Sequence, residues 1–210
     1  IIENCFSREE IKFLKDTGYK LMDSQESSFY KMDSKIPNFW RDITSEHSHK
    51  YGVPVVKKSM YFFHWNGEKE FFDLINERWD IMKILSGGSS SYGKSTFPED
   101  GIVDRIQLVQ YPGGTGYLAA HQDPDHNSRC FISGYLSEKG KDFQSGGFWA
   151  LNQKNEKINL ENEIKLGDMG LGSARIVHGV DQIDDYQSSE RWWLGLYTND
   201  SDCVWNNYIS

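Results

Sequence analysis

The first pattern along the chain is helical. Ile11 and Leu14 lie three residues apart, shortly after the segment Ser7-Arg8-Glu9-Glu10. Within that segment Ser7 is a candidate helix N-cap, and Glu10, three residues later, completes a capping box. Gly18 then provides a stop signal. The pattern predicts an amphipathic helix that begins after Ser7 and ends near Gly18.

A second helix is predicted from about Glu68 to Leu85. Its apolar residues recur at three- and four-residue spacing, which is the period of one helix face. They are Phe71, Phe72, Ile75, Trp79, Met82 and Leu85. Between the two helices, residues 24–67 have no clean period. We expect loops and short strands there, including one strand from Lys57 to Trp65.

From Asp104 onward the chain alternates between two sets of residues, as a strand does. One set is Arg105, Gln107, Val109 and Tyr111, and the other is Ile106, Leu108 and Gln110. Further strands are predicted at Arg129–Leu136, Gly147–Asn152, Ala174–Val180 and Arg191–Thr198. Turn signals separate them, without intervening helices. This pattern favours an antiparallel sandwich or jelly roll. We therefore predict one α+β domain over residues 1–210, with a helical and mixed part over 1–100 and a jelly-roll core over 101–200.

Composition narrows the class of protein. The net charge of −8 argues against nucleic-acid binding, which needs clustered basic residues. The sequence shows neither an apolar run of membrane-spanning length nor a signal peptide, so we expect no membrane association. The chain has three cysteines, which are widely spaced and form no disulfide or zinc pattern. A reducing, cytoplasmic location is the simplest interpretation.

His121-Gln122-Asp123 is the first candidate for chemistry. Side chains alternate along an extended strand, so His121 and Asp123 point to the same side. His178, in a later predicted strand, is a candidate third ligand. Two histidines and one carboxylate form a facial triad, which leaves one side of a metal open and suits non-haem iron(II). The alternatives are a surface loop at the first pair and a hydrogen-bonded core histidine at His178.

Arg191 opens the predicted strand Arg191–Thr198. An arginine inside a β core needs a carboxylate partner, which its guanidinium binds through two hydrogen bonds. A dicarboxylate cosubstrate is one such partner. The alternative is a strand-end arginine paired with Glu190, Asp184 or Asp185. Period two places Trp193 on the same face, where it lines a pocket if Arg191 points inward.

Several motifs around these residues occur in a fixed order. They are Tyr111-Pro112-Gly113-Gly114-Thr115-Gly116-Tyr117 before His121, Arg129 before Tyr135-Leu136, Gly146-Gly147-Phe148-Trp149, Gly167-Asp168, His178-Gly179-Val180, and Arg191-Trp192. This series resembles the prolyl 4-hydroxylase-like branch of the 2-oxoglutarate/iron(II)-dependent oxygenases. The resemblance covers nearly the whole chain and is tight after Arg105. The segment between His178 and Arg191 is longer than in that family, and a one-residue slip there turns Arg191 outward.

The resemblance implies a double-stranded β-helix (jelly roll) supported by N-terminal helices. It implies iron(II) held by His121, Asp123 and His178, and 2-oxoglutarate held by Arg191 with Tyr135 or Tyr111. The implied enzyme is a dioxygenase that uses O2 to hydroxylate an unactivated C–H bond, releasing succinate and CO2. The resemblance also makes Trp193, Trp149, Tyr117 and Arg129 candidate substrate-pocket residues.

The substrate is open at this point: a prolyl-like peptide and a small molecule both fit the resemblance. Trp40, Arg41, Lys57, Lys58 and Lys94, in the segments expected to flank the pocket, can bind an anionic group, although we favour ordinary solvated charges. His64 and His126 are rival metal ligands that we interpret as structural or surface residues, with a place in the substrate pocket as an alternative for His64. The alternative functions are a cupin-like metal enzyme without 2-oxoglutarate, a non-catalytic jelly-roll binding module, and a structural zinc protein.

Overall fold

The computed structural model describes residues 1–30, 36–48, 52–94, 102–125, 130–187 and 189–200. The helices are α1 (Arg8–Ser24), α2 (Ser45–Ser48) and α3 (Lys69–Leu85), with short 3-10 turns η1 (His64–Asn66) and η3 (Leu160–Asn162). The strands are β1 (Phe39–Ile43), β2 (Val55–Phe63), β3 (Ile102–Pro112), β4 (Tyr117–His121), β5 (Cys130–Tyr135), β6 (Gly147–Leu151), β7 (Lys157–Asn159), β8 (Met169–Ser173), β9 (His178–Asp181) and β10 (Glu190–Asp200).

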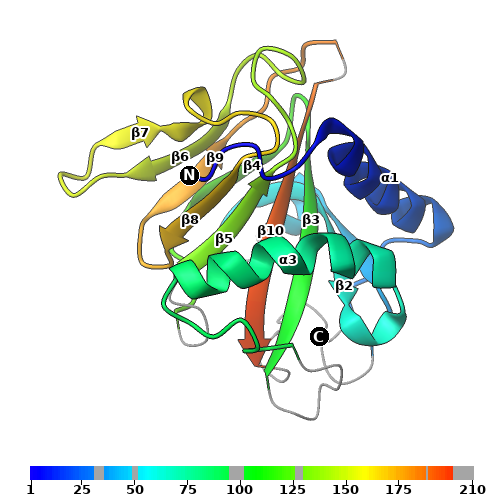
Figure 1. Ribbon diagram of the computed structural model, residues 1–210. Helices are drawn as coiled ribbons and strands as arrows, with labels where there is room; N and C mark the ends of the chain where they lie inside the picture. The colour runs from blue at the N-terminus through cyan, green and yellow to red at the C-terminus, as the bar shows by residue number, and fades with distance from the viewer. Residues whose placement is uncertain (31–35, 49–51, 95–101, 126–129, 188, 201–210) are drawn as a thin grey trace.

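The strands form one curled antiparallel sheet, in the order β7-β6-β9-β4-β2-β3-β10-β5-β8, with β1 added beside β2. The sheet folds into two layers, and β2 joins them. Val55 and Val56 of β2 pair with β4, whereas Lys58 to Phe63 pair with β3. Figure 1 shows α1 and α3 packed against the larger layer. The predicted jelly roll with N-terminal supporting helices is confirmed.

The larger layer has two different faces because successive strand residues point to opposite sides. Ile106 and Leu108 of β3 point outward and, with Trp192, Leu194 and Leu196 of β10, meet the apolar faces of α1 and α3. The alternate residues of the same strands point into the barrel. The outer face therefore holds the main hydrophobic core, and the inner face is left for polar groups.

Helix α1 begins as predicted and ends later. Ser7 accepts a hydrogen bond from the Glu10 backbone N–H, and the Glu10 carboxylate accepts one from the Ser7 N–H, so the capping box is confirmed. The predicted stop at Gly18 is wrong, because the helix continues to Ser24. A Cβ on Gly18 would lie 2.9 Å from the Trp192 ring. This glycine allows α1 to approach the sheet closely, rather than ending the helix.

The predicted strand over Ala174–Val180 is wrong in its first half. Ala174 begins a turn, and β9 starts only at His178. The preceding strand β8 was not predicted. Its sequence, Met-Gly-Leu-Gly-Ser, contains two glycines. Glycine is depleted in strands, so this sequence looks like a turn rather than a strand. The other predicted strands and the second helix lie within a few residues of the predicted bounds.

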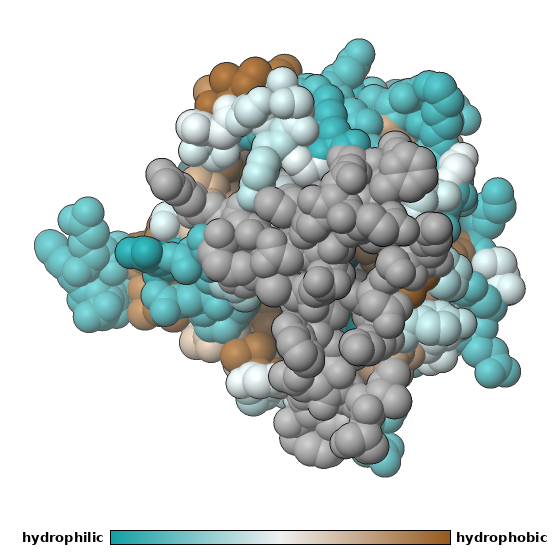
Figure 2. All heavy atoms as spheres, turned by 90° about the horizontal axis from the view of Figure 1, so that it is seen from below, coloured by the Kyte–Doolittle hydropathy of each residue, from teal (hydrophilic) through white to brown (hydrophobic). Residues whose placement is uncertain are grey.

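Figure 2, viewed from below Figure 1, shows the β6–β7 hairpin projecting to one side as a hydrophilic arm. Its tip carries exposed Lys154 and Glu156. Among the described residues, no helix combines the length and the apolar character that a membrane crossing requires.

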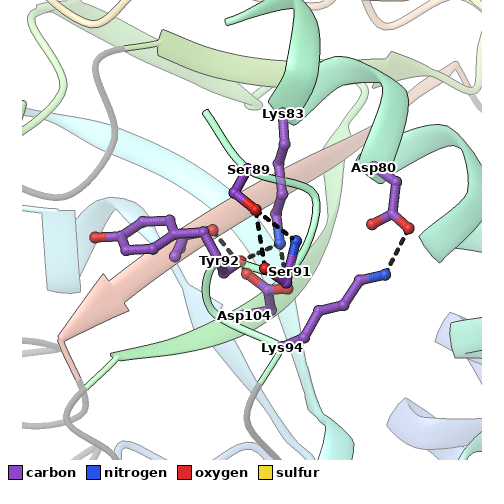
Figure 3. A network of polar contacts seen from close by, with 8 residues as sticks. Asp80, Lys83, Ser89, Ser91, Tyr92, Lys94 and Asp104 are labelled. Carbon is purple, nitrogen blue, oxygen red and sulfur yellow. Dashed lines mark hydrogen bonds and ion pairs between the residues drawn. The ribbon is translucent and has the colours of Figure 1, made fainter. Parts of the chain in front are cut away.

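A buried ion pair fixes α3 to β3. Lys83 Nζ lies 2.6 Å from Asp104 Oδ2, and both side chains are almost completely buried. Lys83 also donates to the Tyr92 carbonyl at 2.5 Å, and Thr198 donates to Asp104 Oδ1 at 2.7 Å. Figure 3 shows Lys83 reaching from the helix into this polar cluster. Each charge is compensated inside the protein, so the loss of one partner leaves the other buried and unpaired.

We predict that Lys83→Met lowers the free energy of unfolding by about 3–5 kcal/mol, because it leaves the Asp104 carboxylate without its counter-ion. Chemical denaturation measures the change. The matched control is Asp80→Asn, which breaks the half-exposed pair between Lys94 and Asp80 in the same cluster. It should cost about 1 kcal/mol or less. Equal losses in the two variants would contradict a structural role for the buried pair.

Candidate metal centre and adjoining cavity

Two neighbouring strands of the smaller layer bring the predicted metal ligands together. His121 is the last residue of β4, His178 is the first residue of β9, and the two are direct cross-strand partners. Asp123 lies two residues beyond the end of β4. Its N–H donates to the Ala174 carbonyl at 3.0 Å, which fixes the segment after the strand. The turn at Ala174, absent from the sequence prediction, therefore helps to position the carboxylate.

The three side chains converge on one point. His121 Nε2 lies 3.6 Å from Asp123 Oδ1, and His178 Nε2 lies 3.8 Å from Asp123 Oδ2. The candidate ligand atoms all lie within 4.8 Å of one another. On the far side of each ring, His121 Nδ1 hydrogen-bonds the Ala119 carbonyl at 3.1 Å and His178 Nδ1 hydrogen-bonds the Ile176 carbonyl at 2.9 Å.

This arrangement fits a divalent metal. A ring whose Nδ1–H donates to a carbonyl carries its free lone pair on Nε2, and such outer bonds also fix the ring orientation. Burial lowers the pKa of His178, which favours the neutral ring that ligates metals. Burial raises the pKa of Asp123, but the electrostatic influence of His121, His178 and Lys57 outweighs burial, so the net shift is downward. The carboxylate therefore stays ionised and available as a ligand.

A cavity of about 200 Å³ lies beside the three ligands, inside the barrel. Apolar side chains such as Leu118, Phe131 and Phe148 form part of its wall, and Lys57 and Tyr197 are among the polar groups. The wall therefore combines apolar side chains, which limit the entry of water, with polar groups that can fix the orientation of what binds there.

Arg191 reaches the same cavity from β10. It points inward and is only 1% exposed. Its partner is a buried glutamate: the Arg191 Nε–H donates to Glu161 Oε2 at 3.0 Å, and Nη2 lies 2.9 Å from the same oxygen. The remaining nitrogen, Nη1, is buried and has no hydrogen-bond partner. The guanidinium therefore keeps one free donor nitrogen beside the cavity, which suits a carboxylate oxygen.

The acidic residues proposed as alternative partners of Arg191 make other contacts. Glu190 accepts hydrogen bonds from Tyr19 and from the Trp192 indole. Asp184 accepts from backbone N–H groups, including that of Gln144 at 2.7 Å. Glu190 thus connects β10 to α1, and Asp184 connects the segment before β10 to the segment before β6.

Glu161 is the main residue of this site that sequence reasoning missed. It lies in η3, and its Oε2 also accepts the Phe148 N–H at 2.5 Å. Gly147 has φ +103°, and a Cβ there would lie 2.5 Å from the Glu161 side chain. The second glycine of Gly146-Gly147 therefore makes room for the carboxylate. The sequence around Glu161 has no periodicity that marks it as buried.

Tyr111 and Tyr135 both lie near Arg191. Tyr111 is its cross-strand partner and has its ring centroid 5.6 Å from the guanidinium carbon. Tyr135 is buried on β5, opposite Trp193 of β10. Burial raises the pKa of both phenols, so their hydroxyls stay protonated and can donate hydrogen bonds.

Not all of the candidate substrate-pocket residues line the cavity. Trp193 lines the cavity. Trp149 is buried in β6 with Lys157 over its ring, and Tyr117 pairs with Val56 of β2; neither belongs to the cavity wall that the described residues form. Arg129 lies outside the described residues, as does His126.

The charged residues expected to flank the pocket differ in their surroundings. Lys57 lines the cavity, and Arg41 is buried in β1 with its guanidinium carbon 4.9 Å from the Tyr61 ring centroid. For these two residues the interpretation as ordinary solvated charges is wrong. Lys94 forms the half-exposed pair with Asp80, as a solvated charge does. His64 packs on Phe72, with ring centroids 4.0 Å apart, away from the three ligands.

Comparison with known proteins rests on structure alone. No protein-family model and no curated protein matches this sequence. A prolyl-4-hydroxylase from Pseudomonas putida is similar in structure, with a TM-score of 0.59 at 12% identity over 94% of this chain and 89% of that one. EctD from S. alaskensis, solved with 2-oxoglutarate and 5-hydroxyectoine, has a TM-score of 0.58 at 14% identity over 95% and 71%.

A third similar structure is SnoK, a non-heme alpha-ketoglutarate-dependent carbocyclase from nogalamycin biosynthesis. Its TM-score is 0.55 at 10% identity, over 95% of this chain and 78% of that one. The feature shared with all three is the fold, which is the double-stranded β-helix of 2-oxoglutarate/iron(II)-dependent oxygenases. The predicted resemblance to this superfamily is confirmed at the level of the fold.

We predict that His121→Ala and Asp123→Ala each weaken Ni²⁺ binding by more than about 100-fold. Loss of a residue that only hydrogen-bonds a metal ligand weakens binding by roughly 10–100-fold, and each of these variants removes a ligand itself. Isothermal titration of the apo-protein measures the affinity. The matched control is His64→Ala, which removes a histidine outside the cluster and should leave the affinity unchanged. Metal binding that survives both ligand variants would contradict this assignment.

Proposed function

We propose that this protein is an iron(II)- and 2-oxoglutarate-dependent dioxygenase that hydroxylates an unactivated C–H bond, with release of succinate and CO2. The observation that carries the proposal is the convergence of His121, Asp123 and His178 beside a cavity that also holds a buried arginine. A three-residue triad leaves positions open on one side of the metal, as this chemistry requires. The similar structures named above support the proposal through their fold.

The chain's own residues would hold the metal without further rearrangement. The backbone carbonyls of Ala119 and Ile176 keep the two imidazoles turned toward the centre. Asp123 supplies the anionic ligand. When bound, iron(II), 2-oxoglutarate and O2 supply the oxidising chemistry, while the protein binds, orients and excludes water.

Arg191 is the proposed anchor for the second carboxylate of 2-oxoglutarate. Its free Nη1 would donate a hydrogen bond to one carboxylate oxygen, and the protonated hydroxyls of Tyr111 and Tyr135 are proposed further donors. Glu161 holds the guanidinium in place, because it takes up the Nε and Nη2 donors. This gives Arg191 a fixed orientation before the cosubstrate arrives, which lowers the entropy cost of binding.

Arg191 and the three candidate ligands also bear on the rival functions. A cupin-like metal enzyme without 2-oxoglutarate gives the buried Nη1 of Arg191 no task. A structural zinc site prefers four closed ligands, whereas the cluster found among the described residues has three. A binding module without turnover has no need for the ordered rings of His121 and His178. The substrate is proposed to be a small molecule or a prolyl-like peptide.

The first test is anaerobic absorption spectroscopy of the apo-protein, with iron(II) added first and 2-oxoglutarate second. We expect a weak visible charge-transfer band that requires both additions. Iron binding without the band would favour the cupin-like alternative. An absence of iron binding would favour the binding module.

A second test separates the two charges of the buried pair. We predict that the double variant Glu161→Gln/Arg191→Met binds 2-oxoglutarate at least about tenfold more weakly than Glu161→Gln alone, because a charged hydrogen bond contributes about 1.5–3 kcal/mol. In Glu161→Gln the amide oxygen can still accept the Arg191 donors, and the double variant removes both charges of the pair, so both variants should fold and bind metal. Anaerobic titration measures the affinity. Equal affinities in the two variants would show that Arg191 does not hold the cosubstrate.

A further inference from the structure

Lys57 presents an uncompensated cation to the metal cavity. It lies on β2 immediately after the two residues that pair with β4, and its side chain forms part of the cavity wall. Its ammonium group makes no hydrogen bond or ion pair with any of the residues that the structure describes. Two fully buried cations of the described residues do have carboxylate partners: Arg191 has Glu161, and Lys83 has Asp104.

Two further cations, Arg41 and Arg105, lie near Lys57. Arg41 of β1 is 3% exposed, and its Nε is buried without a hydrogen-bond partner. The guanidinium carbons of Arg41 and Arg105 lie 4.9 and 5.3 Å from the centroid of the same Tyr61 ring. Arg105 also lies 4.8 Å from the Tyr197 ring centroid, and Tyr197 lines the cavity. This part of the chamber wall thus contains Lys57, and the charges of Arg41 and Arg105 lie close to it without forming part of the wall.

This wall lies away from the Arg191 end of the barrel. Arg191 is paired with Tyr111 at one end of β10, whereas Tyr197 is paired with Arg105 six residues further on. Six strand residues span roughly 20 Å. Tyr61 and Asp123 favour the charged form of Lys57, whereas Arg105 and Arg41 disfavour it, so these four groups surround its ammonium. Lys57 therefore faces the part of the cavity beyond the metal ligands, rather than the proposed cosubstrate anchor.

Asp123 cannot serve as the counter-ion of Lys57 once a metal is bound. It is the carboxylate that acts on Lys57, and it is also the anionic member of the ligand cluster. With 2-oxoglutarate also bound, the anions at the metal at most balance the charge of the metal, so none of them offsets the ammonium of Lys57. An ammonium enclosed in the cavity wall needs a further anion from outside the chain, because an unpaired charge in such a site is costly.

We propose that the substrate carries an anionic group, a carboxylate or a phosphate, and that Lys57 binds this group beside the metal. The inference rests on the proposed function, because it names the class of substrate for that same site. Lys57 supplies the direct hydrogen bonds, and Arg41 and Arg105 behind Tyr61 add positive potential. The substrate's anion would fix which C–H bond lies nearest the metal.

The test uses the full chain loaded with Mn²⁺ and 2-oxoglutarate, so that the Arg191 site is already filled. Butanoate, butyl phosphate and neutral butanamide are the probes, and the broadening of their proton NMR lines by Mn²⁺ reports binding near the metal. We expect at least one anionic probe to bind about tenfold or more tightly than butanamide. Comparison of butanoate with butyl phosphate tells which anion fits.

Lys57→Met should remove this preference and leave the affinity for 2-oxoglutarate unchanged. The matched control is Lys58→Met, the next residue on the same strand, which points to the opposite face and should have no effect on any probe. Unchanged anion binding in Lys57→Met, or equal binding of the three probes, would overturn the inference while leaving the proposed function intact. A loss of 2-oxoglutarate affinity in Lys57→Met would also overturn it, since Lys57 would then serve the cosubstrate. Wild-type protein that binds neither metal nor 2-oxoglutarate would overturn both proposals.

Discussion

A strand can turn only every second side chain toward the inside of a barrel, and the arrangement of this protein follows from that constraint. Along β3 and β10 the outward residues are apolar and are covered by α1 and α3. The inward residues of the same strands are the polar and aromatic groups of the cavity. The helices are thus required for function only indirectly: they cover the apolar face and leave the other face free to carry chemistry.

Inside such a barrel, charge balance decides what each cation can do. Glu161 takes two nitrogens of Arg191, which keeps the guanidinium charged, oriented and partly satisfied. Lys83 is fully compensated by Asp104 and serves only to fix a helix. Lys57 has no such partner among the described residues. Groups of similar charge therefore have different roles, and the roles are set by the carboxylate that the chain does or does not place beside each one.

The parts predicted from sequence are those that depend on short-range pattern. The capping box at Ser7, the apolar face of α3 and the alternation of β3 each involve residues a few positions apart. The three ligands were also found, because His121 and Asp123 are near neighbours and His178 sits in a recognisable motif. Figure 1 shows how the fold then brings β4 and β9 side by side.

The parts that were missed depend on contacts between distant segments. Glu161 is buried because Arg191, thirty residues later, and Gly147 receive it. Nothing near Glu161 in the sequence marks that. Gly18 has the local signature of a helix stop, but its role is set by Trp192 on the far strand. Strand β8 has a glycine-rich sequence that short-range rules assign to a turn.

The dual pairing of β2 has a consequence for how such a protein can change during evolution. Val55 and Val56 close the barrel against β4, and the adjacent Lys57 faces the chamber. Val55 and Val56 hold β4 through backbone pairing, whereas Lys57 reaches the chamber only through its side chain. Substitution of Lys57 therefore changes the inner wall, while the closing pair and the strands that carry the ligands keep their places. A one-residue insertion would not have this effect, because it would also turn the core residues Met60 and Phe62 inward. Substrate range can thus change at this position without passing through a form that has lost its metal.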